Sequence, residues 1–191
     1  MKKYLLGEIV LGNEGLLRGP FGSDLKKSLY VEKGKNTCKV FLQENILTEN
    51  NEVGNYYISK DYYESKMKRY QVKENDFIVT CDGTLGEIFQ LKNLKEDGII
   101  SSSLLRITLN PEIVDYDYFY YLFKCSIKRG LITKGNNSVL KHLPGIGIIK
   151  KYEIELPEIN IQKKIGKILR TIDNKIRNSN HINDNLTYKV A

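Results

Sequence analysis

The sequence predicts an α+β fold in which a globular domain over residues 1–157 is followed by a long helix over residues 158–191. Two patterns favour this organisation. Short runs rich in β-branched and aromatic residues, separated by turn residues, indicate strands in the first part of the chain. Isoleucine and leucine at steps of three and four residues indicate a helix in the last part.

Local signals predict the elements of the domain. Apolar runs bounded by turn residues predict strands at residues 38–42, 76–81, 86–91, 99–109 and 152–156. Asp82, Gly83 and Thr84 predict a hairpin turn between the second and third of these strands. Helices are expected at residues 60–70 and 115–131, the second of them capped by Asp115 or Asp117.

The C-terminal helix begins after Pro157, because proline neither continues a strand ladder nor sits inside a helix. Asn160 is expected to cap it. A helix from Asn160 to Val190 would measure roughly 45 Å at about 1.5 Å per residue, which exceeds what the core of one domain needs. The helix therefore either folds back on its own domain or pairs in a coiled coil. The polar Ser179 and Asn183 within its apolar stripe favour pairing.

Charge and composition narrow the class of protein. The net charge is +7, and the segment from Pro157 onward holds seven basic and three acidic residues, which favours a polyanionic partner such as DNA. No apolar run approaches the roughly 20 residues that span a bilayer, and Glu8 argues against a secretion signal. Cys38, Cys81 and Cys125 are far apart, which favours a reduced, cytoplasmic setting over a disulfide framework.

The usual catalytic motifs do not occur in the sequence. Gly145, Ile146 and Gly147 lack the third glycine of a dinucleotide site, and no Gly-x-Ser-x-Gly, His-Glu-x-x-His or Cys-x-x-Cys is present. His142 and His181 are isolated, so no metal site is predicted. We therefore expect no intrinsic catalysis and no metal or cofactor bound by this chain.

A glycine-rich loop over residues 18–27 is the first candidate for contact with DNA. Glycines on both sides of Pro20 and Phe21 let the backbone turn tightly and approach another surface. The side chains suited to phosphates or base edges are Arg18, Ser23, Lys26 and Lys27. The alternative is a structural turn around a buried Phe21.

A second candidate loop follows the predicted helix at 115–131. Its polar side chains are Lys134, Asn136, Asn137, Ser138 and Lys141, although solvated loops have the same composition. Six aromatic residues between Tyr116 and Phe123 suit either stacking on bases or packing in a core. Their helical spacing favours the core.

Three groups of residues together carry a resemblance to a known family. Residues 19–23 (Gly-Pro-Phe-Gly-Ser) precede Leu25 and Lys26; residues 76–80 (Asp-Phe-Ile-Val-Thr) precede two glycines; and residues 162–165 (Gln-Lys-Lys-Ile) follow a Leu-Pro pair. In this order they resemble the specificity subunits of Type I restriction-modification systems. Full-length members carry two target-recognition domains, each followed by a helix, and this chain is similar to one half of such a subunit.

The resemblance implies that residues 1–157 form a target-recognition domain that reads one half of a bipartite double-stranded DNA target. Two copies would pair residues 158–191 as an antiparallel coiled coil, so that the helix acts as a ruler. The residues expected to form this seam are Ile161, Ile165, Ile168, Leu169, Ile172, Ile176 and Leu186. S-adenosylmethionine, ATP and magnesium would be used by partner methyltransferase and restriction subunits.

Two other functions stay open. An adaptor or antirestriction-like module would bind methyltransferase subunits without reading a DNA sequence. A standalone nuclease or methyltransferase would have to turn over substrate by itself, and the missing pocket motifs argue against it.

Overall fold

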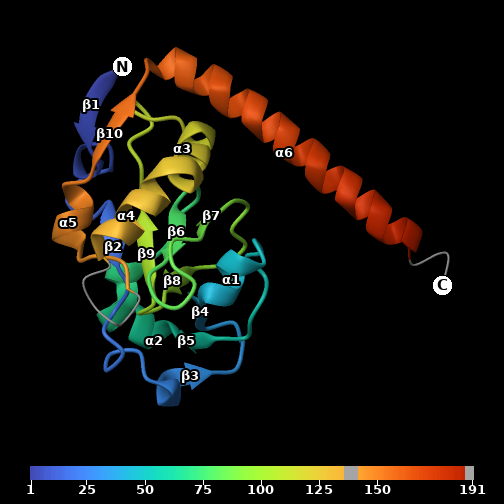
Figure 1. Cartoon of the computed structure of the whole chain (residues 1–191). Coiled ribbons are helices and arrows are strands. Elements are labelled where there is room, and N and C mark those ends of the chain that lie inside the picture. The colour runs from blue at the N-terminus through green and yellow to red at the C-terminus, as the bar shows by residue number, and fades with distance from the viewer. Residues whose placement is uncertain (136–141, 188–191) are drawn as a thin grey trace.

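In the computed structural model, residues 1–135 and 142–187 are described, and their strands form three sheets (Figure 1). The first sheet pairs β1 (Lys2–Leu5) with β10 (Glu153–Leu156). The second has the order β2 (Leu16–Arg18), β9 (Leu104–Ile107), β6 (Phe77–Thr80) and β7 (Ile88–Gln90). The third has the order β3 (Tyr30–Val31), β5 (Tyr57–Ser59), β4 (Thr37–Phe41) and β8 (Gly98–Ile100).

Helices cover these sheets. The α-helices of five residues or more are α1 (Gln43–Leu47), α3 (Tyr116–Leu122), α4 (Lys128–Gly135), α5 (Ile146–Lys150) and α6 (Ile159–Thr187). Between α3 and α4 the helix continues through a π-turn, η5 (Phe123–Ile127), and a similar composite of α2 (Lys60–Tyr62), η3 (Tyr63–Met67) and η4 (Lys68–Tyr70) follows β5. Short 3-10 helices, η1 (Leu6–Glu8) and η2 (Lys27–Leu29), complete the domain.

The central strand β6 shows why the domain holds together. Phe77 and Val79 belong to a core formed with α3, η5 and α4, whereas Ile78 belongs to a second core formed with α1 and the third sheet. Successive side chains of a strand point to opposite faces, so β6 is buried on both sides. Its continuous apolar run follows from this double burial.

The predicted helices at 60–70 and 115–131 are confirmed, and the second extends to Gly135. Asp115 is the cap, because its carboxylate accepts a hydrogen bond from the Tyr118 amide at 2.9 Å. The turn around Gly83 does join two antiparallel strands, β6 and β7. The predicted strands at 38–42, 76–81, 86–91 and 152–156 correspond to β4, β6, β7 and β10.

The predicted strand at 99–109 is wrong, because it is two strands in different sheets. β8 pairs with β4 in parallel, whereas β9 pairs with β2 and β6. Between them the chain turns at residues 101–103, where the Leu104 amide bonds to the Ser101 carbonyl at 3.1 Å. Three consecutive serines are a turn signal that the apolar residues on either side concealed. The short strands β1, β2, β3 and β5 were not predicted from the sequence.

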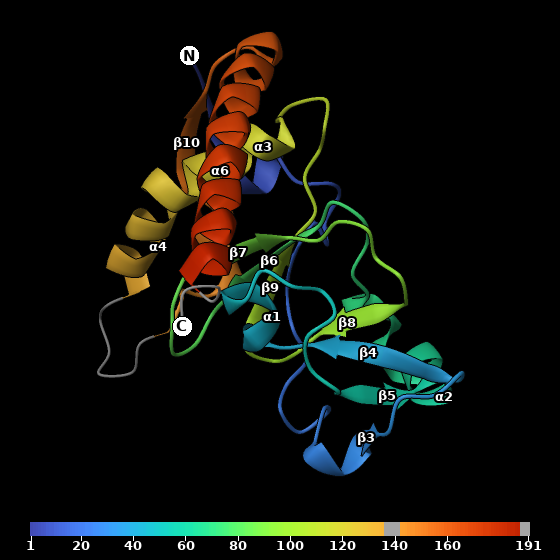
Figure 2. The ribbon, with the colours of Figure 1, turned by 90° about the vertical axis from the view of Figure 1, so that its right-hand side faces the viewer.

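The long helix α6 starts at the end of the domain opposite the third sheet and runs along one side of the domain toward the level of α1 (Figures 1 and 2). Asn160 is not its cap. The helix begins at Ile159, and the amides of Ile161 and Gln162 bond to the Glu158 carbonyl at 2.9 and 3.0 Å. Pairing of β1 with β10 places the start of the chain beside the base of α6.

Candidate nucleic-acid interface

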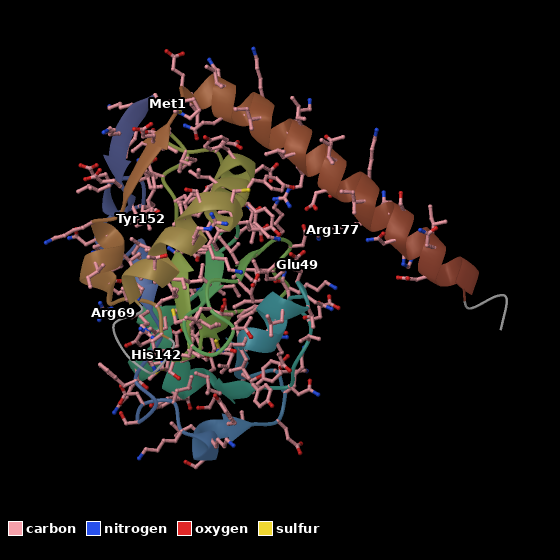
Figure 3. The ribbon with its side chains drawn as sticks, in the orientation of Figure 1. Met1, Glu49, Arg69, His142, Tyr152 and Arg177 are labelled. Carbon is pink, nitrogen blue, oxygen red and sulfur yellow. The ribbon has the colours of Figure 1, made fainter. Side chains whose placement is uncertain are left out.

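Three chain segments meet at the carboxylate of Asp82, which follows β6. Arg18, at the end of β2, places its Nη2 2.8 Å from Asp82 Oδ1. His142, which follows α4 in the sequence, places its Nδ1 2.5 Å from the same oxygen (His142 is labelled in Figure 3). Gln43 also donates to the Asp82 carbonyl at 2.8 Å. This cluster of Arg18, Asp82 and His142 therefore joins both predicted loops to the end of the second sheet.

The loop after Arg18 is anchored on one side and open on the other. A Cβ at Gly19 would lie 1.8 Å from the Ser101 carbonyl oxygen, so only glycine allows the two backbones to approach this closely. Pro20 is buried, but Phe21 is 82% exposed. The alternative of a turn around a buried phenylalanine is therefore wrong.

The remaining residues predicted for this loop lie on the surface. Ser23 and Lys26 are exposed, and Lys27 is exposed at the start of η2. The Tyr62 hydroxyl donates to the Asp24 carbonyl at 2.6 Å, which ties the loop to α2. Arg18 differs from them, because its guanidinium is already paired with a carboxylate.

The glycine turn between β6 and β7 packs against α4. Gly83 and Gly86 have φ of 68° and 71°, a backbone conformation that side chains with a Cβ rarely adopt. A Cβ at Gly86 would come within 2.8 Å of Lys128 Cγ, and Lys128 pairs with Glu87 at 2.5 Å. The turn and α4 are thus held together beside Asp82.

Most of the second predicted loop lies outside the described residues. Asn136, Asn137, Ser138 and Lys141 lie outside the described residues, as does the side chain of Lys134. Helix α4 ends at Gly135, and His142 forms a β-bridge with Asp82.

The aromatic residues of α3 and η5 pack in the core. Phe119 and Phe123 are buried, with ring centroids 5.9 Å apart, and Phe119 lies 5.3 Å from Phe77. Burial raises the pKa of Tyr121 to about 12, and its hydroxyl donates to Asp173 of α6 at 3.2 Å. The core interpretation of this cluster is confirmed.

Burial also keeps two of the cysteines unreactive. It raises the pKa of Cys38 and of Cys81 to about 12, so neither thiol is ionised at neutral pH. Among residues 1–135 and 142–187, no group of three or more histidine, cysteine, aspartate or glutamate side chains is placed to hold a metal ion. Within the same ranges, none of the helices combines the length and apolar character that crossing a bilayer requires.

Helix α6 docks on its own domain through a polar stripe. Gln162 is 1% exposed; it accepts a hydrogen bond from the Asp115 amide at 3.1 Å and donates to the Ile113 and Pro157 carbonyls at 3.1 and 2.8 Å. One turn further, Gly166 lies so close to α3 that a Cβ would be 2.7 Å from the Tyr118 nitrogen. Arg170 follows, 2.7 Å from Asp117 and above the ring of Tyr120.

The apolar stripe of α6 faces away from the domain. Its isoleucines are between 37% and 60% exposed: Ile161, Ile165, Ile168, Ile172, Ile176 and Ile182. Leu169, at the border of the two stripes, is half-buried, and the side chain of Leu186 is outside the described residues. The possibility that this stripe folds back on its own domain is therefore wrong. Exposed apolar area of this kind marks an interaction surface.

A mixed domain of helices and sheets joined to a long helix with an exposed apolar stripe defines the class of fold to which this chain belongs. The model of a protein family described as Type I restriction modification DNA specificity domain matches residues 22–188. This match covers most of the chain, and the chain therefore belongs to that family.

Individual relatives agree with this assignment. The Type I restriction enzyme MjaVIII specificity subunit of Methanocaldococcus jannaschii is 32% identical over 125 residues, which are 62% of this chain and 27% of that protein. The S subunit of a Type-I restriction-modification system from M. genitalium shares the fold, with a TM-score of 0.59 at 20% identity, covering 93% of this chain and 40% of that one.

Other solved structures share the fold. The HsdS subunit of Thermoanaerobacter tengcongensis has a TM-score of 0.61 at 12% identity over 92% of this chain and 38% of that one. A chain from work on complex assembly and conformational transition of the type I R-M system has a TM-score of 0.65 at 13% identity, covering 92% of this chain and 39% of that one. This chain thus spans between about a quarter and two fifths of the relatives that it matches.

Proposed function

We propose that this chain is a DNA-specificity half-subunit. Its domain would read one half of a bipartite double-stranded target, and α6 would pair with α6 of a second copy. The observation that carries the proposal is the orientation of α6 on its domain. The helix buries Gln162 and Gly166 against the domain and exposes its isoleucines. Family membership supports the same conclusion.

An antiparallel pair of α6 helices would relate the two domains by a two-fold axis. A homodimer then recognises a palindromic target with an unspecified spacer, because the protein symmetry is imposed on the DNA. The 29 residues of α6 correspond to roughly 43 Å at about 1.5 Å per residue. That length matches about 13 base pairs at 3.4 Å each, which sets the scale for the separation of the half-sites.

Contact with DNA would centre on the loop after β2. Ser23, Lys26 and Lys27 are the exposed candidates, whereas the guanidinium of Arg18 is paired with Asp82. Lys134, Asn136, Asn137, Ser138 and Lys141 are the candidates on the far side of the Asp82 cluster. Lysine contacts to phosphate position a protein on DNA, whereas contacts to base edges specify the sequence.

Partner subunits would carry out the chemistry in the cytoplasm. The chain itself would bind no cofactor; a methyltransferase subunit would use S-adenosylmethionine, and a restriction subunit would use ATP and magnesium. The alternative from another class is an adaptor that binds methyltransferase subunits without reading DNA, and the exposed isoleucines alone suit that function as well.

The test combines adenine methylation with oligomeric state. Deleting the gene should abolish methylation at one palindromic bipartite motif in the source cell, as read by single-molecule sequencing. Replacing Ile165, Ile172 and Ile176 by glutamate should give a monomer by light scattering, whereas Lys167→Glu, on another face of α6, should leave a dimer. Unchanged methylation together with a stable methyltransferase complex would favour the adaptor.

A further inference from the structure

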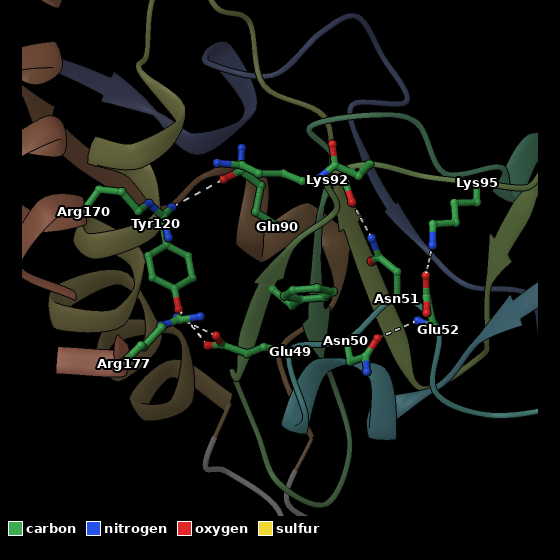
Figure 4. Close-up of a pocket in the computed structure, with 12 residues that line it drawn as sticks. Glu49, Asn50, Asn51, Glu52, Gln90, Lys92, Lys95, Tyr120, Arg170 and Arg177 are labelled. Atoms are coloured by element: carbon green, nitrogen blue, oxygen red, sulfur yellow. Dashed lines mark hydrogen bonds and ion pairs between the residues drawn. The ribbon is translucent and has the colours of Figure 1, made fainter. Parts of the chain in front are cut away.

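An ion pair between Arg177 and Glu49 connects the part of α6 beyond α3 to the domain. Past Asp173 the helix crosses a polar cavity of about 450 Å³ that separates it from α1 and β7 (Figure 4). Arg177 spans this cavity and places its Nη2 2.5 Å from Glu49 Oε2, while a second oxygen of Glu49 accepts from the Tyr120 hydroxyl at 2.9 Å. Figure 3 shows the two side chains approaching from the helix and from the end of α1.

The segment that carries Glu49 is held by side-chain hydrogen bonds within the domain. Asn45, which is buried, donates through its amide to the Asn50 and Val53 carbonyls at 3.1 and 2.8 Å. Glu49 itself has a φ of 49°, in the left-handed region that residues with a Cβ rarely adopt.

The Arg177 end is held by a second carboxylate. Arg177 Nη2 lies 3.3 Å from Asp173, which in turn accepts from the Tyr121 hydroxyl. Burial lowers the pKa of Arg177, but the carboxylates of Glu49 and Asp173 outweigh it and raise the pKa. The half-exposed guanidinium is thus paired with one carboxylate next to α1 and with another on α6 itself.

The ion pair lies far along α6 from the residues that dock the helix on the domain. Arg177 is 15 residues beyond Gln162, or about 22 Å along the helix axis at about 1.5 Å per residue. A 10° change in helix direction moves a point at that distance by roughly 4 Å, which is about the rise of one base pair. Small changes in the angle of α6 thus produce displacements on the scale of one base-pair step.

We propose that Glu49 and Arg177 form a strut that fixes the angle between α6 and the domain, and thereby selects the spacer length of the bipartite target. They are positioning residues: neither belongs to the exposed apolar stripe or to the loops proposed to contact DNA. The spacer part rests on the proposed function, whereas the angle part is a property of the chain alone.

The angle is tested first, without DNA. Nitroxide labels at Lys35→Cys and Asn180→Cys, in a chain in which the exposed Cys125 is replaced by serine, report the distance between the domain and the far part of α6. The labelled chain is diluted with unlabelled chain so that only distances within one protomer are measured. We expect Glu49→Gln and Arg177→Ala to broaden the distance distribution by several ångströms, and Lys167→Ala to leave it narrow.

Spacer choice is tested second, by methylation of a library of targets that differ only in spacer length. The strut variants should methylate targets one base pair longer or shorter at several-fold higher relative rates than the wild type, with the half-site sequences and the melting temperature unchanged. A narrow distance distribution in both strut variants would overturn the proposal. If the wild-type chain directs no methylation, the proposed function fails, and the distances still decide whether the strut exists.

Discussion

The side-chain carbonyl of Gln162 accepts a hydrogen bond from the backbone amide of Asp115 at 3.1 Å, and this bond joins the first turn of α6 to the cap of α3. The amide group of the same side chain donates to two carbonyls, one before α6 and one before α3. A single buried residue thus satisfies backbone groups at the junction of domain and helix.

Replacing Gln162 by leucine should destabilise the protein by about 2–3 kcal/mol. The loss leaves the Asp115 amide and two carbonyls without this partner, and an unsatisfied buried polar group costs about 1–3 kcal/mol. Urea denaturation followed by circular dichroism measures the change. Lys163→Leu, at the exposed neighbouring position, is the control and should stay within about 0.5 kcal/mol of the wild type.

Gly166→Ala should destabilise the protein although alanine is the better helix former by about 1 kcal/mol. The added Cβ would lie 2.7 Å from Asp115 Oδ1 and from the Tyr118 nitrogen, so α6 has to move away from α3 at a cost of about 1–3 kcal/mol. Gly147→Ala in α5, where a Cβ meets nothing within 4 Å, should be neutral or stabilising. Equal effects of the two substitutions on thermal unfolding would contradict the close packing.

Lys39→Met should stabilise the protein by about 1 kcal/mol at neutral pH. Lys39 is 2% exposed and forms no ion pair among the described residues. Burial lowers its pKa, so the unfolded chain binds a proton more tightly than the folded protein does. The unfavourable contribution of Lys39 to wild-type stability should therefore diminish as the pH increases toward 10.5, where unfolded lysine loses its proton.

The measurement compares wild type and Lys39→Met in urea at pH 7 and pH 10. The stability difference should shrink at the higher pH, since the wild-type cost is then relieved. Lys35→Met, at an exposed position, should show no such dependence. A difference that grows with pH would mean that the Lys39 ammonium is stabilised in the folded state.

Lys26→Ala should weaken binding to every DNA sequence and reduce the slope of log K against log salt by about 1, as expected for one lost phosphate contact. Fluorescence anisotropy at several salt concentrations measures both quantities. Lys66→Ala, exposed on η3, serves as a control for the loss of one charge. A changed target motif instead of a uniform loss would show that Lys26 reads a base edge.

Much of the fold could be predicted from local sequence. The helix at 115–131 and its Asp115 cap, the turn at Gly83 and the long C-terminal helix all depend on contacts within a few residues. The division of residues 99–109 between two sheets could not be predicted, because which sheet a strand joins depends on partners such as β4, about sixty residues earlier. The pairing of Arg18 with Asp82 escaped prediction for the same reason.

The periodicity of the C-terminal segment determined by itself that it is a helix with an apolar stripe, since steps of three and four residues are a property of the chain alone. Only the tertiary structure decided which stripe meets the domain. Gln162 and Gly166 fit the buried backbone groups at the end of α3, where an isoleucine could neither bond to them nor pack so closely. The apolar stripe is left facing outward because hydrogen bonds and close backbone contact, rather than burial of apolar surface, determine how α6 docks.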